Sequence, residues 1–220
     1  MGAVTYYLAL PFIYLLSYLP FRALYLVSDV MYFFVYRVLG YRKAVVTTNL
    51  ERSFPEKSPD EIDAIRRDFY RYFCDLSLET LKTLTVSPAA LNDHMSCGDM
   101  SAFEHFFEKK QSVIIVMGHL GNWELIGDWI MDITPVTALY RPPRLRFLDR
   151  VMRAGRARTG VTPVPVDRQG LKALHTALKQ GDGVVILPDQ VPKTTGASGV
   201  VAPFFGRPAM TMTLIGRLAR

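Results

Sequence analysis

A short apolar segment that runs into a glycine-rich turn is the feature that most constrains this sequence. Residues 112–116 read Ser-Val-Ile-Ile-Val, and residues 117–124 continue as Met-Gly-His-Leu-Gly-Asn-Trp-Glu. A brief run rich in β-branched residues, closed by glycine and followed by a helix-compatible stretch, predicts a buried strand, a turn and a helix. Open α/β sheets keep their ligands beyond the carboxyl ends of the strands, so His119 is expected at the functional edge.

The spacing between His119 and Glu124 predicts how the two side chains are used. On one continuous helix, residues five apart point about 140° away from each other. We therefore expect His119 in the turn and Glu124 in the first helical turn, where the carboxylate can hold one imidazole nitrogen as N–H. Because residues 117–124 contain no Ser or Cys, the attacking group is expected to be a substrate hydroxyl. The alternative is a buried histidine that is hydrogen-bonded at a helix start.

Strand-like and helix-like segments alternate after this turn. The motif helix is expected to end near Met131, and strands are expected at 136–140, 161–166 and 183–187, separated by helices at 145–158 and 169–180. This alternation predicts an α/β fold with a mostly parallel sheet flanked by helices. Ahead of the first strand, Ser-Pro-Asp-Glu at 58–61 is a capping box that predicts a long amphipathic helix to about Leu84.

Polar residues follow two of the later strands. Asp189 and Gln190 follow the fourth strand, so we expect them to border the same pocket as His119. Arg141 follows the second strand and precedes a helix rich in arginine. On that helix Arg146, Arg150 and Arg153 share a face, which is typical either of a surface for phosphate or anionic lipid or of an ordinary solvated face. Asp167 is expected to cap the next helix.

The N-terminal region is apolar. Residues 3–19 carry no charge, and a second apolar run covers residues 23–36 with Asp29 as its only charge. We expect residues 1–40 to form a membrane anchor or helices lying in the bilayer surface, and residues 41–220 to form the catalytic domain. Two core helices are the alternative. Arg37, Arg42 and Lys43 place the following domain on the cytoplasmic side.

Charge and cysteine content narrow the classes of function. A net charge of +6 and a pI near 9.4 indicate an anionic partner. Aromatic residues are scarce in the arginine-rich stretch, so nucleic acid is not expected. Cys74 and Cys97 show no metal or redox spacing, and neither a metal nor a cofactor is expected. Two other functions are alternatives. A metal-dependent hydrolase would use His119, Glu124 and Asp189, but the sequence lacks the paired-histidine signature of such enzymes. A non-catalytic membrane-binding module would leave the His-acid turn unexplained.

Several of these blocks together resemble a known family. His119 and Glu124 resemble the H-x4-D/E pair of glycerolipid-type acyltransferases, and residues 118–124 resemble the version found in the lipid A late acyltransferases, the lauroyl and myristoyl transferases of the lysophospholipid acyltransferase superfamily. Matching blocks occur at residues 41–57, at Tyr-Arg-Pro 140–142, at Pro-Asp-Gln 188–190 and at Pro-Phe-Phe-Gly 203–206. The family normally continues with further strands, so the domain is expected to be incomplete after residue 220.

The resemblance implies a specific reaction. His119, oriented by Glu124, would act as general base while a hydroxyl of a lipid A precursor attacks the thioester of an acyl-acyl carrier protein, with no acyl-enzyme. Arg141 and Arg156 would meet the phosphorylated substrate, and Asp189 and Gln190 would contribute to substrate binding. The expected location is the bacterial inner membrane, with the catalytic domain on its cytoplasmic side, and the pathway is lipopolysaccharide biosynthesis. Another glycolipid or phospholipid remains an alternative acceptor.

Overall fold

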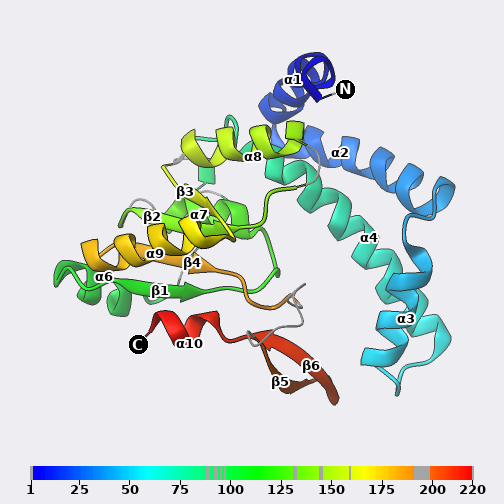
Figure 1. The fold of residues 1–220 in the computed structure, drawn as a ribbon. Coiled ribbons are helices and arrows are strands. Elements are labelled where there is room, and N and C mark those ends of the chain that lie inside the picture. The colour runs from blue at the N-terminus through cyan, green and yellow to red at the C-terminus, as the bar shows by residue number, and fades with distance from the viewer. Residues whose placement is uncertain are drawn as a thin grey trace.

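The structure is a computed structural model that describes residues 2–87, 90–91, 94, 96, 98–130, 133–143, 146–158, 160–190 and 199–219. A parallel sheet with helices on its faces forms one part of the molecule, and an arm of N-terminal helices lies beside it (Figure 1).

The arm consists of consecutive helices. Its elements are α1 (Gly2–Tyr18), α2 (Phe21–Tyr32), the π-helix η1 (Phe33–Val38), α3 (Lys43–Ser53) and α4 (Pro59–Lys82). Helix α2 packs along α4, and Leu24 and Cys74 are fully buried. The ammonium of Lys82 donates to the carbonyls of Ser17 and Leu19, each at 2.8 Å. It therefore satisfies carbonyl groups at the C-terminal end of α1 that have no partner within the helix.

The remaining elements build the sheet and its cover. They are α6 (Ser101–Glu108), β1 (Val113–Val116), α7 (Trp123–Ile130), β2 (Val136–Tyr140), α8 (Arg146–Arg158), β3 (Thr162–Pro165), α9 (Arg168–Gln180), β4 (Gly183–Ile186), β5 (Gly199–Phe204), β6 (Arg207–Met212) and α10 (Leu214–Leu218). The four sheet strands and the helices between them match the predicted segments closely. An antiparallel β5–β6 hairpin, which the sequence did not predict, lies outside this sheet.

The main sheet has the order β1-β4-β2-β3, and all its strands are parallel. The predicted α/β class with a mostly parallel sheet is therefore confirmed. Strand β4 is buried along its whole length and contributes to the core on both faces, because successive side chains of a strand point to opposite sides. Val184 and Ile186 pack with Leu174 and Leu218 on one side, while Val185 packs with residues such as Ile115 and Ile130 on the other.

Caps explain where two of the helices begin. Ser58 Oγ accepts from the amide of Glu61, and the Glu61 carboxylate accepts from the amide of Ser58 at 2.9 Å, so the predicted capping box of α4 is confirmed. Asp167 caps α9 as predicted, since its Oδ1 accepts from the amide of Gly170 at 2.8 Å. Helix α9 then ends at Gly181, whose φ of 87° is left-handed.

The apolar N-terminal region yields no single helix, among the described residues, that is both long and apolar enough to cross a bilayer. Two helical segments, Phe21–Val38 and Lys43–Ser53, are long and apolar enough when taken together, and an 89° bend separates them. Many large apolar side chains of the arm are exposed, including Leu8, Phe12 and Leu15 of α1. The assignment of residues 1–40 to a membrane-associating segment stays a prediction.

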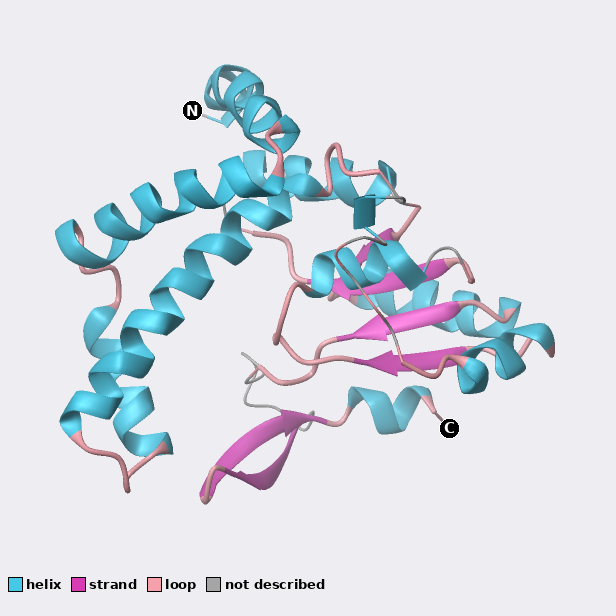
Figure 2. Ribbon diagram, turned by 180° about the vertical axis from the view of Figure 1, so that it is seen from behind, coloured by secondary structure: helices cyan, strands magenta, loops and turns pink. Residues whose placement is uncertain are grey.

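The strands direct their carboxyl ends towards the helical arm (Figure 2). Residues that follow β1, β2 and β4 therefore lie at the edge of the sheet that faces the arm. This is the edge at which the sequence places His119, Arg141 and Asp189.

Candidate active site

The turn after β1 is held in place at both ends. At its start, the amide of Met117 donates to the carbonyl of Ile186 at 3.1 Å, which extends the pairing of β1 with β4. At its end, Asn122 caps α7, because its Oδ1 accepts from the amide of Leu125 at 3.4 Å. Between them Gly121 adopts a φ of 70°, in the left-handed region that favours glycine. His119 therefore sits in the turn, as predicted.

The end of β4 supplies two partners for the imidazole. Asp189 Oδ1 lies 2.6 Å from His119 Nδ1, and Asp189 Oδ2 accepts from the His119 backbone amide, also at 2.6 Å. The side-chain nitrogen of Gln190 lies 3.2 Å from His119 Nε2. The expectation that Asp189 and Gln190 lie beside His119 agrees with this arrangement, which the parallel pairing of β1 and β4 produces.

The ionisation state of the Asp189 carboxyl group determines which ring nitrogen of His119 carries the proton. Burial acts to raise the pKa of Asp189, but the hydrogen bonds from the His119 backbone amide and imidazole, together with the electrostatic interaction with that ring, hold the pKa below its usual value. An ionised carboxylate only accepts hydrogen bonds, so Nδ1 of His119 carries the proton. Nε2 of the neutral ring then has a lone pair, to which the amide of Gln190 donates. The side chain of His119 is 29% exposed.

Glu124 is placed differently from the expectation. Instead of reaching back to His119, its carboxylate forms a bidentate ion pair with Arg156, with Arg156 Nε to Glu124 Oε2 at 2.9 Å and Arg156 Nη2 to Glu124 Oε1 at 2.5 Å. The reason is that Glu124 is the second residue of α7, from which its side chain meets α8. Both side chains are largely buried, at 9% and 12% exposure. The carboxylate that holds His119 is Asp189.

The arginines of the second block lie at and beyond the end of β2. Arg141 directly follows β2 and is exposed, at the sheet edge shared with His119. Arg156 lies over the ring of Tyr140, with its guanidinium carbon 5.1 Å from the ring centroid. The Tyr140 hydroxyl donates to Asp149 at 3.0 Å. Burial and this hydrogen bond raise the pKa of Tyr140, so it stays a neutral hydroxyl.

An aromatic ring lies against the imidazole of His119. The ring of Trp123 meets that of His119 edge to face, with centroids 4.8 Å apart. Leu120, the next residue after His119, is 84% exposed. A base on Nε2 with apolar neighbours suits chemistry on a substrate that brings its own hydroxyl and a hydrocarbon chain.

One further contact of the turn was not anticipated from the sequence. The side-chain amide of Asn122 donates to Glu79 Oε2 of α4 at 2.9 Å. Glu79 lies on an amphipathic helix, whose sequence pattern predicts most of its carboxylates on the solvent face. No sequence signal therefore distinguished Glu79 from the others.

Among the residues that the structure describes, no group of three or more His, Cys, Asp and Glu side chains is arranged to hold a metal ion. His94 hydrogen-bonds the carbonyl of Ala90 at 2.8 Å and His105 lies 2.9 Å from the ammonium of Lys109. Cys97, which was considered above, lies outside the described residues.

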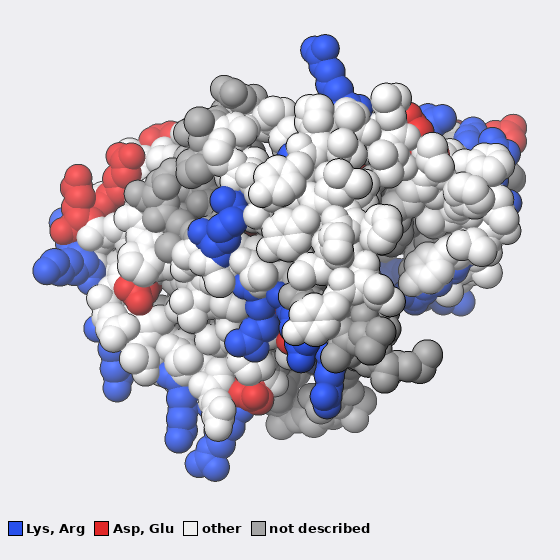
Figure 3. All heavy atoms as spheres, turned by 90° about the horizontal axis from the view of Figure 1, so that it is seen from above, with Lys and Arg blue, Asp and Glu red and all other residues white. Residues whose placement is uncertain are grey.

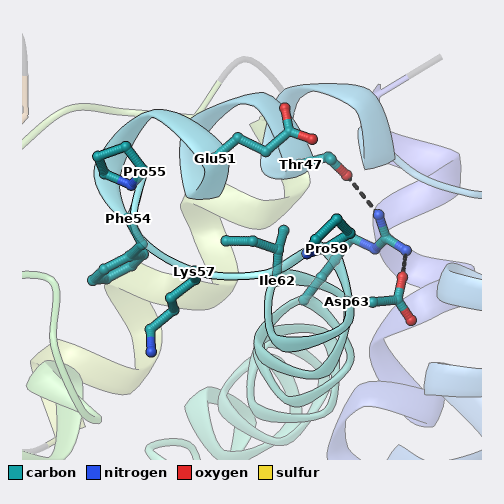
Figure 4. A pocket seen from close by; sticks show the side chains of 9 residues that line it. Thr47, Glu51, Phe54, Pro55, Lys57, Pro59, Ile62 and Asp63 are labelled. Atoms are coloured by element: carbon teal, nitrogen blue, oxygen red, sulfur yellow. Dashed lines mark hydrogen bonds and ion pairs between the residues drawn. The ribbon is translucent and has the colours of Figure 1, made fainter.

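A separate hollow of about 420 Å³ lies in the helical arm (Figure 4). Its lining side chains come from α3, the loop after it and the start of α4. Arg66 bridges its wall by donating to Thr47 Oγ1 at 2.8 Å and pairing with Asp63. Because no residue from the strand ends lines this hollow, it is distinct from the His119 site.

Comparison with known proteins identifies a matching family and similar proteins. The family described as bacterial lipid A biosynthesis acyltransferase matches residues 2–220. The lipid A biosynthesis palmitoleoyltransferase of Escherichia coli (strain K12) is 26% identical over 164 residues, which are 74% of this chain and 52% of that protein. The lipid A biosynthesis acyltransferase of Shigella flexneri has the same identity and coverage. The chain thus spans about half the length of the curated relatives it matches.

Proposed function

Because this chain belongs to the bacterial lipid A biosynthesis acyltransferase family, we propose that it transfers a fatty acyl chain to a hydroxyl of a lipid A precursor. The proposed donor is the thioester of an acyl-acyl carrier protein. The observation that carries the proposal is the imidazole of His119, which Asp189 holds through Nδ1 at 2.6 Å while Nε2 faces Gln190.

In the proposed reaction, the acceptor hydroxyl displaces the amide of Gln190 from His119 Nε2. Nε2 takes the hydroxyl proton as the oxygen attacks the thioester carbonyl, and Asp189 stabilises the imidazolium that forms. Backbone N–H groups at the start of α7, or the guanidinium of Arg141, stabilise the oxyanion. Collapse of the tetrahedral intermediate breaks the C–S bond, and the departing thiolate receives the proton from His119. The products are the ester and the free carrier thiol.

Glu124 and Arg156 have a supporting part in this proposal. Their bidentate pair joins α7 to α8 next to the turn, so it holds the start of α7, and with it Trp123, in a fixed position. This assignment replaces the direct contact of Glu124 with His119 that was expected from the sequence. The contact of Arg156 with substrate phosphate that the family resemblance implies stays a prediction.

Both proposed substrates suit the surface around α1 and α8. Helix α1 contacts α8, and the face that carries these helices shows Lys and Arg side chains beside a broad uncharged surface (Figure 3). Arg146, Arg150 and Arg153 of α8 are exposed. We propose that the apolar side chains of α1 and α2 rest in the cytoplasmic surface of the bacterial inner membrane, with these arginines at the level of lipid phosphates and of the acidic carrier.

Acyl transfer from radiolabelled acyl-acyl carrier protein to a tetra-acylated lipid A precursor, measured in membranes, tests the function. We expect His119→Ala to lower transfer by about 10²–10⁴-fold, the usual contribution of a general base. The matched control is His175→Ala, which changes an exposed histidine of α9 and should leave transfer unchanged.

Two results would contradict the proposal. Full transfer by His119→Ala would exclude His119 as the base. Absence of transfer by the unmodified protein to this acceptor, with transfer to a phospholipid or another glycolipid in a parallel panel, would replace the proposed acceptor and leave the role of His119 to be tested on the new one.

A further inference from the structure

The carboxylate of Glu79 joins two segments that are far apart in the sequence. It accepts a hydrogen bond from the side-chain amide of Asn122 at 2.9 Å and another from the hydroxyl of Tyr25 at 2.7 Å. Glu79 lies near the C-terminal end of α4, Tyr25 lies on α2, and Asn122 closes the turn that holds His119. A carboxylate with one donor on each oxygen has a fixed orientation, since charge-assisted hydrogen bonds are stronger than neutral ones.

The contact with Asn122 determines how the turn ends. Asn122 presents its side-chain oxygen to the amide of Leu125 and its nitrogen to Glu79, and only one orientation of the amide group satisfies both. The next residue, Trp123, contacts the ring of His119. A shift of Asn122 would therefore move the start of α7 and the aromatic neighbour of the imidazole.

The contact with Tyr25 links the same carboxylate to the apolar arm. Burial and the hydrogen bond to Glu79 raise the pKa of the Tyr25 phenol, so the hydroxyl keeps the proton that it donates. The residues that flank Tyr25 on the outer side of α2, such as Leu26 and Val30, are exposed. Helix α2 and the His119 turn thus donate hydrogen bonds to the same carboxylate. A displacement of the helix is therefore transmitted to the turn through Glu79.

We infer that Glu79 is a positioning residue that fixes the His119 turn through Asn122 and couples it to the placement of helix α2 through Tyr25. The contribution to turnover rests on the proposed acyl transfer, whereas the effect on the order of the turn does not. Glu79 acts on the turn through its hydrogen bond with Asn122, so it is a positioning residue and not a catalytic residue.

Amide hydrogen exchange of residues 118–126 in the purified full chain tests the coupling without any activity measurement. We expect Glu79→Ala to raise exchange there by about 10-fold or more, the factor that corresponds to loss of a hydrogen bond to a charged group. Asn122→Ala should have a similar effect, and the double variant should add little to either. Tyr25→Phe should also raise exchange in this segment, because it removes only the hydroxyl donor to Glu79.

Two variants serve as controls. Glu79→Gln keeps an oxygen that accepts from Asn122 and offers an NH2 group that donates to the Tyr25 hydroxyl, so both contacts are retained and exchange should stay within about threefold of the unmodified protein. Asp68→Ala removes a carboxylate of the same helix that pairs only at the surface with Arg71, and it should leave the turn unchanged. Exchange in residues 118–126 that is unaltered by Glu79→Ala, or additive effects of Glu79→Ala and Asn122→Ala, would overturn the inference.

Kinetics provide a second readout that a purely structural role would not give. If Glu79 positions the turn, Glu79→Ala should lower kcat for acyl transfer by about 10–100-fold, because small displacements of reacting groups are costly, while KM changes by less than about threefold. A parallel loss of active protein, with unchanged kcat per folded molecule, would contradict positioning. Absence of transfer by the unmodified protein would defeat the proposed function and leave the exchange result standing.

Discussion

At the scale of single residues, Asp189 determines what His119 can do. The carboxylate accepts from both the backbone amide and Nδ1 of His119, so the ring orientation and the tautomer have the same origin. Gln190 lies at the opposite nitrogen, where the acceptor hydroxyl replaces it in the proposed reaction. The three side chains form a unit although 70 residues separate His119 from Asp189.

We predict that Asp189→Asn lowers acyl transfer by about 10²–10⁴-fold, since the neutral amide neither stabilises an imidazolium nor enforces the tautomer. The measurement is the membrane transfer assay. Asp182→Asn, at the opposite end of β4, is the matched control. Transfer within a few-fold of the unmodified protein would mean that another group orients His119.

The lowered pKa of Asp189 also predicts how this pair responds to acid. A carboxyl whose pKa is depressed in the folded state stabilises the fold above its unfolded pKa, about 3.9, and loses that contribution as the pH falls through the lower folded value. The part of the stability difference between the unmodified protein and Asp189→Asn that comes from the Asp189 carboxylate should be present above about pH 5 and be lost as the pH falls below that value. Denaturant unfolding at several pH values between about 5 and 2 measures it, and a difference that does not shrink on acidification would contradict the assignment.

The buried pair of Glu124 and Arg156 gives a stability prediction. Glu124→Ala leaves a largely buried guanidinium without its carboxylate, so we expect unfolding to become easier by about 3–5 kcal/mol. The double variant Glu124→Leu/Arg156→Met should recover most of the loss, because it removes the uncompensated charge. Equal destabilisation of the single and double variants, measured by urea denaturation, would argue against the pair as the cause.

At the scale of elements, glycine is required where two backbone segments approach each other closely. Helix α9 begins against the end of β3, and a Cβ on Gly170 would lie 1.8 Å from the carbonyl oxygen of Pro165. Backbone cannot move aside as a flexible side chain can. This contact fixes how closely α9 covers the sheet.

We therefore expect Gly170→Ala to destabilise the protein by about 1–3 kcal/mol, the usual cost of overpacking. Gly216→Ala is the control, because Gly216 lies in α10 with nothing within 4 Å of an added Cβ. There the same change should stabilise by about 0.5–1 kcal/mol through helix propensity. Thermal unfolding of both variants distinguishes the cases, and equal shifts would contradict the packing argument.

The elements themselves were largely predictable, whereas the contacts between them were not. Periodicity and caps identified α4, α8, α9 and the four strands of the sheet, because these signals are local. The partner of His119 depends on β4 lying next to β1, although β4 is the last of these strands in the chain. The nearby Glu124 was the natural local choice, but its place on α7 directs it to Arg156. Glu79 contacts Asn122 only because α4 passes the sheet edge, which no local pattern encodes.

At the scale of the whole molecule, the apolar surface of α1 is the prominent unpartnered feature of the described chain. Leu8, Phe12 and Leu15 are all exposed and lie at helical spacing on one face. Burial of such side chains in lipid contributes about 1.5–3 kcal/mol each. This surface is the basis of the proposed membrane contact.

Replacing Leu8, Phe12 and Leu15 together by Ser should weaken binding to anionic phospholipid vesicles by about 10²-fold or more. Vesicle co-flotation measures this binding. The matched control replaces Val200, Val201 and Phe204 of the β5–β6 hairpin, which are exposed to a similar degree. If the hairpin variant lost binding and the α1 variant retained it, the hairpin would be the membrane-contacting element.

The capping of α1 by Lys82 limits how this protein can be re-engineered. The ammonium is buried, burial lowers its pKa, and its two acceptors are the carbonyls of Ser17 in α1 and of Leu19 directly after that helix. A chimera in which a foreign helix replaces residues 2–19 would leave this cation without these acceptors unless the new segment ended with carbonyls in the same places. The unit to be exchanged is therefore α1 together with the end of α4. We expect a graft that replaces both segments to preserve the fold, whereas a graft joined at Pro20 replaces α1 alone and leaves Lys82 behind.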